Sequence, residues 1–205
     1  RFLEPGIEFF PYLLMKVKYL EEIEGTKETE ALWDLTEGEM VINTKDWNKT
    51  HGFSECIKAG ATTQEFKILS LLAKKGGSLE RSIIAKTLNS DYEEIENWIR
   101  SCQRKKLLIQ QGTTCRLHMQ SPLFKLVPET KIEEKLMTKM STKETKKSPN
   151  FTPSQIEKIA HAVFGQHFAV RSTTLVYLPV HVVTVQNPDG SIHLSYWNAL
   201  NGKRL

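Results

Sequence analysis

Apolar residues recur at helical spacing near the middle of the chain. Thr62 and Thr63 stand before a run in which large apolar residues repeat every three or four positions from Phe66 to Leu72, and Gly76-Gly77 follows this run. A hydroxyl residue before such a pattern and glycine after it are typical of the two ends of a helix. The pattern therefore predicts one amphipathic helix here.

Two more helices and a hairpin are predicted directly downstream. Ser78 is expected to cap a second, short helix. Asn89-Ser90-Asp91 should end that helix and cap a third, which carries an apolar stripe over residues 92–102. Residues 107–110 and 115–119 are two short β-like runs with Gly112 in the turn between them.

Three helices followed by a hairpin, within residues 61–119, resemble the winged helix-turn-helix family. The resemblance implies DNA binding, with the third helix in the major groove and the hairpin wing on the phosphate backbone. Carboxylates at the start of that helix oppose base reading because they repel phosphate; they are Asp91, Glu93, Glu94 and Glu96. The candidates for non-specific backbone contact are Arg81, Lys86, Arg100, Arg104, Lys105, Lys106 and Arg116. The alternative is a protein–protein adaptor whose basic residues are only solvated.

Two segments at opposite ends of the chain resemble each other. Each contains a proline, in Phe10-Pro11 and in Leu178-Pro179, then a strand-like run, and later a Trp with a Gly five residues after it, in 33–38 and in 197–202. Each copy predicts two antiparallel strands, with the turn of the second copy at Pro188-Asp189-Gly190 and a positive φ at the closing glycine. A proline within a strand predicts a strand start, an edge or a bulge. Coincidence is the alternative, and the sequence leaves open whether the two hairpins share a sheet.

These patterns predict an α+β chain in which a winged helix lies between two small antiparallel hairpin-containing modules. The expected parts are an N-terminal hairpin module (1–60), a winged-helix domain (61–128), a Lys-rich linker (129–150) and a helix–hairpin module (151–205). The last module should begin with a helix that Thr152-Pro153 starts and Gly165 ends. The linker is expected to be helical to about Met140 and then a mobile, hydrophilic connection, with a basic arm for nucleic acid as the alternative.

A second resemblance concerns the hairpins, through Leu178-Pro179 with the 197–202 motif and its repeat in Phe10-Pro11 with the 33–38 motif. They look like small modules attached to archaeal and bacterial ATPases of the HerA/FtsK class. This implies an accessory fragment of a DNA translocase. From its two ends, the chain is also expected to be part of a longer protein. The sequence contains no Gly-x-x-x-x-Gly-Lys-(Ser/Thr) loop, so any ATPase activity is expected outside this chain.

Composition adds a charge asymmetry to this picture. The net charge is +4, yet residues 1–40 carry 4 basic and 10 acidic side chains, so the rest of the chain is strongly basic. A basic body permits contact with a polyanion. No run of about 18 apolar residues could span a bilayer. An odd number of scattered cysteines (Cys56, Cys102 and Cys115) predicts buried, reduced thiols in a cytoplasmic protein that has no membrane contact.

No reaction can be read from the motifs. His181 and His193 could face each other across the second hairpin, but no third ligand stands at a short spacing, so we expect no metal, and equally no cofactor and no catalytic residue. The expected function is that of a non-catalytic accessory fragment. Its partner would be duplex DNA, bound non-specifically, or other protein subunits.

Overall fold

A computed structural model describes residues 6–21, 25–133 and 145–205. The helices are α1 (Phe53–Ala59), α2 (Thr63–Lys74), α3 (Arg81–Leu88), α4 (Tyr92–Arg104) and α5 (Pro153–Phe164). The strands are β1 (Gly6–Glu21), β2 (Gly25–Asp34), β3 (Met40–Asn43), β4 (Asn48–Lys49), β5 (Ser78–Glu80), β6 (Leu108–Gln111), β7 (Thr114–Leu117), β8 (Thr145–Lys146), β9 (Ala169–Gln186) and β10 (Ile192–Asn198). In these residues no helix is both long and apolar enough to cross a membrane.

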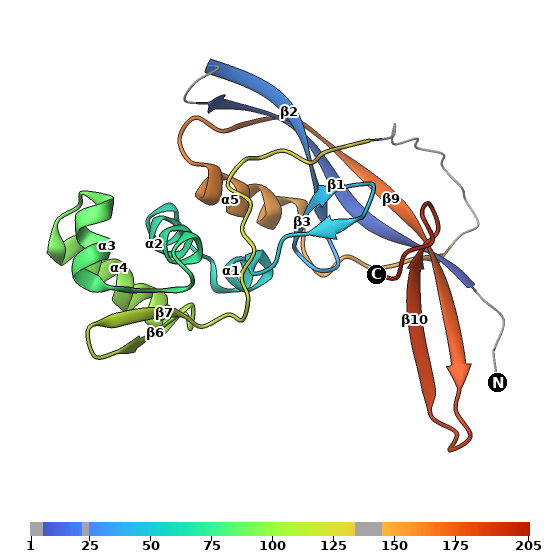
Figure 1. Cartoon of the computed structure of the whole chain (residues 1–205). Helices are drawn as coiled ribbons and strands as arrows, with labels where there is room; N and C mark the ends of the chain where they lie inside the picture. Colours follow the sequence, from blue (N-terminus) through green and yellow to red (C-terminus); the bar gives the residue numbers. More distant parts are fainter. Residues whose placement is uncertain (1–5, 22–24, 134–144) are drawn as a thin grey trace.

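The larger sheet joins the two ends of the chain. Its strand order is β10-β9-β1-β2-β3-β4, and β8 adds to β1 in parallel. β1 and β9 run antiparallel side by side, from Gly6 opposite Val182 to Lys18 opposite Ala169 (Figure 1). The two predicted hairpins therefore belong to one curled sheet, which settles a question that the sequence left open.

The two hairpins have the same pairing. In each, the residue after the proline lies opposite the residue after the tryptophan: Tyr12 opposite Asp34, and Val180 opposite Asn198. The N–H of Gly38 donates to the Asp34 carbonyl at 2.8 Å, and that of the glycine at 202 donates to the Asn198 carbonyl at 2.8 Å. Both glycines have a positive φ, 76° and 68°, as predicted. The sequence similarity thus corresponds to the same strand register and the same closing turn.

The prolines lie inside the long strands, where we did not expect them. Pro11 and Pro179 both lie within the β1–β9 pairing, so neither starts a strand, and no irregularity in that pairing falls at either residue. Pro11 is one position before the hairpin register begins, and its carbonyl accepts the N–H of Leu35 just after β2 ends (3.1 Å). The nitrogen of this proline carries no hydrogen, and it faces the side on which β2 has already ended. No ladder hydrogen bond is therefore lost.

The two faces of the sheet have different cover. α1, α2 and α5 lie on one face (Figure 1), where Trp33 and Met15 are fully buried and Trp33 packs on Phe53 of α1 at a ring distance of 5.2 Å. This buried cluster continues without a break into the core of residues 61–117. A smaller cluster on the other face includes Tyr12, which accepts a hydrogen bond from the Trp47 indole at 3.0 Å. The main core is therefore shared between the sheet and the central helices.

The central region has the order α2-β5-α3-α4-β6-β7, and its second sheet has the strand order β5-β7-β6. Of the two threonines predicted at its start, Thr62 caps α2, in a capping box with Glu65. α4 begins after Asp91, the last residue of the segment predicted to start it. The prediction for Ser78 was wrong: it starts β5, and α3 begins only at Arg81. Pairing of β5 with β7 takes these residues into the sheet, a tertiary contact that local capping signals do not report.

The described ends of the predicted linker lie against the large sheet. Thr130 is buried, and its N–H donates to the Glu30 carbonyl at 2.8 Å while its hydroxyl accepts the N–H of Leu32 at 2.8 Å. Further along, β8 pairs with β1. The expectation of a free connection was therefore wrong for these parts, because they complete the hydrogen bonding of sheet edges. The predicted helix to Met140 falls largely on residues 134–144, which lie outside the described residues.

Candidate nucleic-acid interface

α4 buries one side and exposes a side whose charge changes along the helix. Ile95, Ile99 and Cys102 are fully buried against the rest of the core. The exposed positions run from Glu93 at the start to Arg104 at the end, at helical spacing. The outward face is therefore acidic where the helix begins and basic where it ends.

Two of the predicted DNA-contacting residues form ion pairs within the molecule. Arg81 Nη1 lies 2.7 Å from Glu96 Oε1, and Lys105 Nζ lies 2.6 Å from Glu65 Oε2. Lys105 also donates to the Gly60 carbonyl at 2.9 Å. All four charged groups are at least partly buried, so removing either cation from its partner would leave a poorly solvated carboxylate. These two cations therefore hold α3 and α2 against α4.

The Glu65 carboxylate is held in its charged form. Burial alone raises its pKa, but hydrogen bonds from Lys105, Ser101 and the Thr62 N–H outweigh burial, so the pKa lies below its ordinary value. Glu65 is also the residue that closes the α2 capping box. The end of α4 is thereby fixed to the start of α2.

The other five predicted cations are exposed. Arg100 and Arg104 lie one turn apart on α4, and Lys106 follows in the left-handed turn after it, with φ 57°. Lys86 lies on α3 and Arg116 on β7, so they are carried by other elements. Across the described residues, no ion pair involves any of these five side chains. Arg100, Arg104 and Lys106 form the basic end of α4, and this name is kept below.

The acidic start of α4 is smaller than the sequence indicated. Glu96 faces Arg81, so three carboxylates remain outward: Asp91, Glu93 and Glu94. The Asp91 side chain makes no capping hydrogen bond with the helix. Three solvated carboxylates over one turn still repel phosphate, which opposes insertion of this end into a DNA groove.

The cysteine and histidine expectations had mixed outcomes. The three cysteines are buried and free, and burial raises the pKa of the Cys102 thiol to about 12, so it is a poor nucleophile. The facing of His181 and His193 was a wrong prediction, because His181 lies opposite Trp197 and His193 opposite Val185. In the described ranges, no cluster of three or more His, Cys, Asp or Glu side chains could hold a metal ion.

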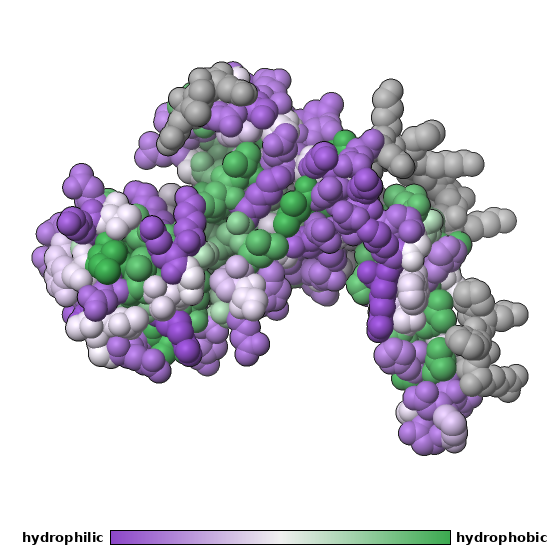
Figure 2. Space-filling view, viewed as in Figure 1, coloured by the Kyte–Doolittle hydropathy of each residue, from purple (hydrophilic) through white to green (hydrophobic). Residues whose placement is uncertain are grey.

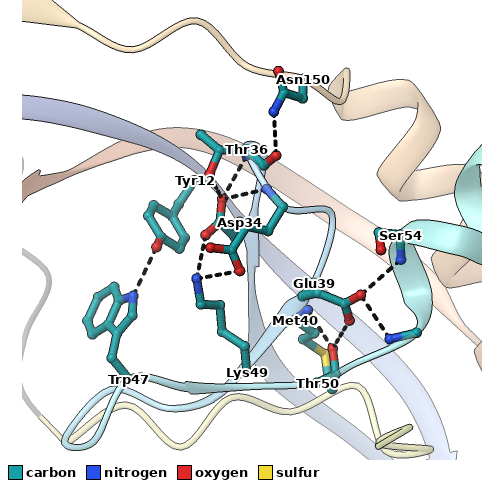
Figure 3. Close-up of polar contacts among 12 residues, drawn as sticks. Tyr12, Asp34, Thr36, Glu39, Met40, Trp47, Lys49, Thr50, Ser54 and Asn150 are labelled. Carbon is teal, nitrogen blue, oxygen red and sulfur yellow. Dashed lines mark hydrogen bonds and ion pairs between the residues drawn. The ribbon is translucent and has the colours of Figure 1, made fainter. Parts of the chain in front are cut away.

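A network of polar side chains, most of them buried, lies at the end of β2, and sequence reasoning missed it (Figure 3). Lys49 of β4 lies 2.9 Å from Asp34 Oδ2 and 2.8 Å from Glu37 Oε2. Glu39 accepts the N–H groups of Gly52 and Ser54 at 3.0 Å, which holds the first turn of α1. These hydrogen bonds lower the pKa of Glu39, but burial raises it by more, so the pKa lies above its ordinary value.

A polar groove of about 490 Å³ opens beside this network, lined by Thr36, Glu37, Glu39, His51, Ser54, Lys58, Asn150, Phe151 and Gln155. Two of the lining residues are joined, because the Asn150 amide donates to the Thr36 carbonyl at 2.7 Å. The charged groups of the network are hydrogen-bonded to one another and to backbone. The arrangement is therefore that of a structural clamp for α1 and the start of α5.

No family of proteins, no curated protein and no solved structure matches this chain. Its function is therefore inferred from the charge, burial and pairing of its own side chains.

Proposed function

We propose that this chain is a non-catalytic accessory region that binds duplex DNA without sequence preference, through the basic end of α4. The observation that carries this proposal is the change of sign along the outward face of α4: carboxylates at its start and three exposed cations at its end. Phosphate contacts need only accessible positive charge, whereas base reading needs the helix start in a groove. The helix is therefore suited to the DNA backbone and unsuited to bases.

The order of elements supports a winged-helix domain as the carrier of this contact. The order α2-β5-α3-α4-β6-β7 places α4 as the third helix, with a hairpin directly after it. In that arrangement Arg116 of β7 and Lys86 of α3 would add contacts beside the basic end of α4. Arg81 and Lys105 are left out of the proposed interface because their charges are satisfied internally.

The proposed setting is a larger cytoplasmic protein, of the kind found among DNA-translocating ATPases of the HerA/FtsK class. The resemblance of the hairpin sequence motifs to modules of those proteins is the basis of this proposed setting. The sequence holds no phosphate-binding loop, so the proposed role is to hold DNA or subunits while another part performs any ATP hydrolysis.

Salt-dependent binding tests the proposal. We expect the chain to bind a fluorescent 20-base-pair duplex at about 50 mM salt and to lose most of this affinity by about 200 mM. The triple variant Arg100→Glu, Arg104→Glu, Lys106→Glu should bind about tenfold or more weakly, because three phosphate contacts become repulsive. Fluorescence anisotropy with two unrelated duplex sequences measures both effects.

The matched control reverses three other exposed cations, Lys16, Lys158 and Arg171, on the sheet and α5. It changes the net charge by the same amount, so it separates a local contact from general attraction. An equal loss of affinity in the two triple variants would overturn the assignment to α4.

A protein-interaction adaptor is the second candidate, and one observation favours it. Ile83 of α3 and Tyr92 of α4 are 46% and 52% exposed in the same central region. A partner protein bound at this surface would cover both side chains, and contiguous apolar surface is what marks protein contacts. Absence of duplex binding at about 50 mM salt would select the adaptor over DNA binding.

A further inference from the structure

The helices α2 and α4 finish at the same end of the small sheet. In both cases three residues, 75–77 and 105–107, connect the helix to a strand, β5 or β6. Both strands run antiparallel to β7, with Ser78 opposite Arg116 and Leu108 opposite Leu117. They therefore begin at the same end of β7, one on each side of it. They lie about 10 Å apart, because neighbouring strands are spaced by about 5 Å.

This end of the small sheet carries more exposed cations than the basic end of α4. Lys74 is the last residue of α2 and Lys75 follows it, and both side chains are exposed. Arg116 of β7 is exposed between the two outer strands, opposite Ser78 of β5 and Ile109 of β6. In the parts of the chain that the structure describes, no ion pair involves Lys74, Lys75 or Arg116. Together with the basic end of α4, these three residues form a surface that we call the basic rim.

The opposite end of the small sheet is not basic. The tip of the β6–β7 hairpin, at residues 111–114, carries no charged side chain. Glu80, the last residue of β5, is exposed and lies opposite Thr114. The charge therefore changes along the small sheet, as it does along α4, from neutral or acidic at one end to basic at the other. Phosphate is attracted to the basic rim and is not attracted to the tip.

The outward side of β7 adds positive charge that the helix ends do not require. Cations in the last turn of a helix are favoured by the helix dipole alone. Arg116 lies on a strand, where that explanation does not apply, and with His118 it alternates with the buried Cys115 and Leu117. The surface around β6 and β7, at the lower left of the molecule, is mostly pale or purple (Figure 2). A polar, positively charged surface is typical of protein–DNA interfaces.

We infer that duplex DNA lies across the basic rim, with its phosphates on Lys74 and Lys75 on one side of β7 and on the basic end of α4 on the other. Arg116 and His118 contact the backbone between these two sides, and the hairpin tip stays clear of the DNA. This inference rests on the proposed function and extends its contact from α4 to α2. The resemblance to winged helices places the hairpin itself on the phosphates, whereas the charges place them at its base.

Two double variants with the same change in net charge test the inference. Lys74→Gln with Lys75→Gln removes two positive charges from the basic rim, and Gln111→Glu with Thr113→Glu adds two negative charges at the tip. The rim variant should bind the duplex about tenfold or more weakly at about 100 mM salt, and its plot of log affinity against log salt should be shallower by about two. The tip variant should stay within about twofold of the unaltered chain. Fluorescence anisotropy measures both, and circular dichroism checks that both variants fold.

Photo-crosslinking tests where the DNA lies. The three cysteines of the chain are buried, so a maleimide crosslinker should react selectively with a cysteine introduced at the surface. Ser78→Cys places the crosslinker opposite Arg116 on the basic rim, and Thr113→Cys places it at the hairpin tip. Irradiation should capture the duplex with Ser78→Cys and not with Thr113→Cys.

The outcomes separate this inference from the proposed function. Affinity of the rim variant equal to that of the unaltered chain, beside a weakened α4 triple variant, would overturn the inference alone. An equal or larger loss in the tip variant, or capture only with Thr113→Cys, would do the same. Absence of duplex binding by the unaltered chain would overturn both.

Discussion

The β1–β2 and β9–β10 hairpins share one backbone plan and differ in what surrounds it. Trp33 is fully buried beneath α1, whereas its equivalent Trp197 is 37% exposed. Asp34 is held by Lys49, whereas the Asn198 amide lacks a partner for its Nδ2 among the described residues. The strand register and the closing turn are thus specified locally, while burial depends on the segment that follows the turn.

The acidic side chains of the first closing turn explain how that segment is held. Asp34 and Glu37 hold Lys49 of β4, and Glu39 holds the start of α1. The equivalents in the second turn are Asn198, Asn201 and Lys203. Asn201 donates to the Lys45 carbonyl and Lys203 pairs with Asp46, both in the β3–β4 loop. One hairpin therefore binds its own continuation, and the other binds a loop of the first.

Truncation of the two tryptophans should produce the largest contrast. Trp33→Ala leaves a cavity among fully buried neighbours and should lower the free energy of unfolding by about 3–5 kcal/mol. Trp197→Ala removes a partly exposed ring and should cost less than about 1 kcal/mol. Urea unfolding followed by circular dichroism measures both, and equal losses would contradict the difference in burial.

Substitution of the two turn glycines should separate backbone strain from crowding. Both have positive φ, so alanine costs roughly 1–2 kcal/mol at either site. At Gly38 a Cβ would also lie 2.8 Å from the Phe151 ring, whereas at Gly202 it would meet nothing within 4 Å. Gly38→Ala should therefore cost a further ~1–3 kcal/mol in unfolding free energy. A larger loss for Gly202→Ala would mean that the second turn is the more crowded one.

The buried ion pair of the first hairpin should give a smaller, pH-dependent effect. Burial alone raises the pKa of Asp34, but Lys49 and the hydrogen bonds from Thr36 outweigh it, so the pKa lies below its ordinary value of about 4. Its contribution is then full above pH 4 and is lost as the pH falls below that value. Asp34→Asn should cost about 1.5–3 kcal/mol at pH 7 and progressively less toward pH 3. Urea midpoints measured across this range test the sign, and a gap that widens in acid would contradict it.

Local signals in the sequence predicted local structure well. Thr62 and Thr63 marked the start of α2, and Gly38 and Gly202 marked turns with positive φ. The helix α1 was missed because its start is held from a distance, by the Glu39 carboxylate on Gly52 and Ser54 N–H groups. No capping side chain stands before it in the sequence.

Contacts between distant segments could not be predicted from the sequence. Which basic residues are available depends on tertiary pairing: Arg81 and Lys105 look like Arg100 and Arg104 in the sequence, but only the first two meet carboxylates from other helices. The pairing of β1 with β9 likewise could not be predicted from the alternation of polar and apolar residues. Every register shifted by two residues buries the same face, so the alternation does not specify one register.

That pairing of β1 with β9 sets the order in which the protein can assemble. The strand Gly6–Glu21 is synthesised long before its neighbour Ala169–Gln186. Non-local pairing of this kind gives a high contact order and slow folding. Until β9 is made, the edge of β1 that it covers has no partner strand, so the growing chain exposes an unpaired strand edge that is prone to aggregation.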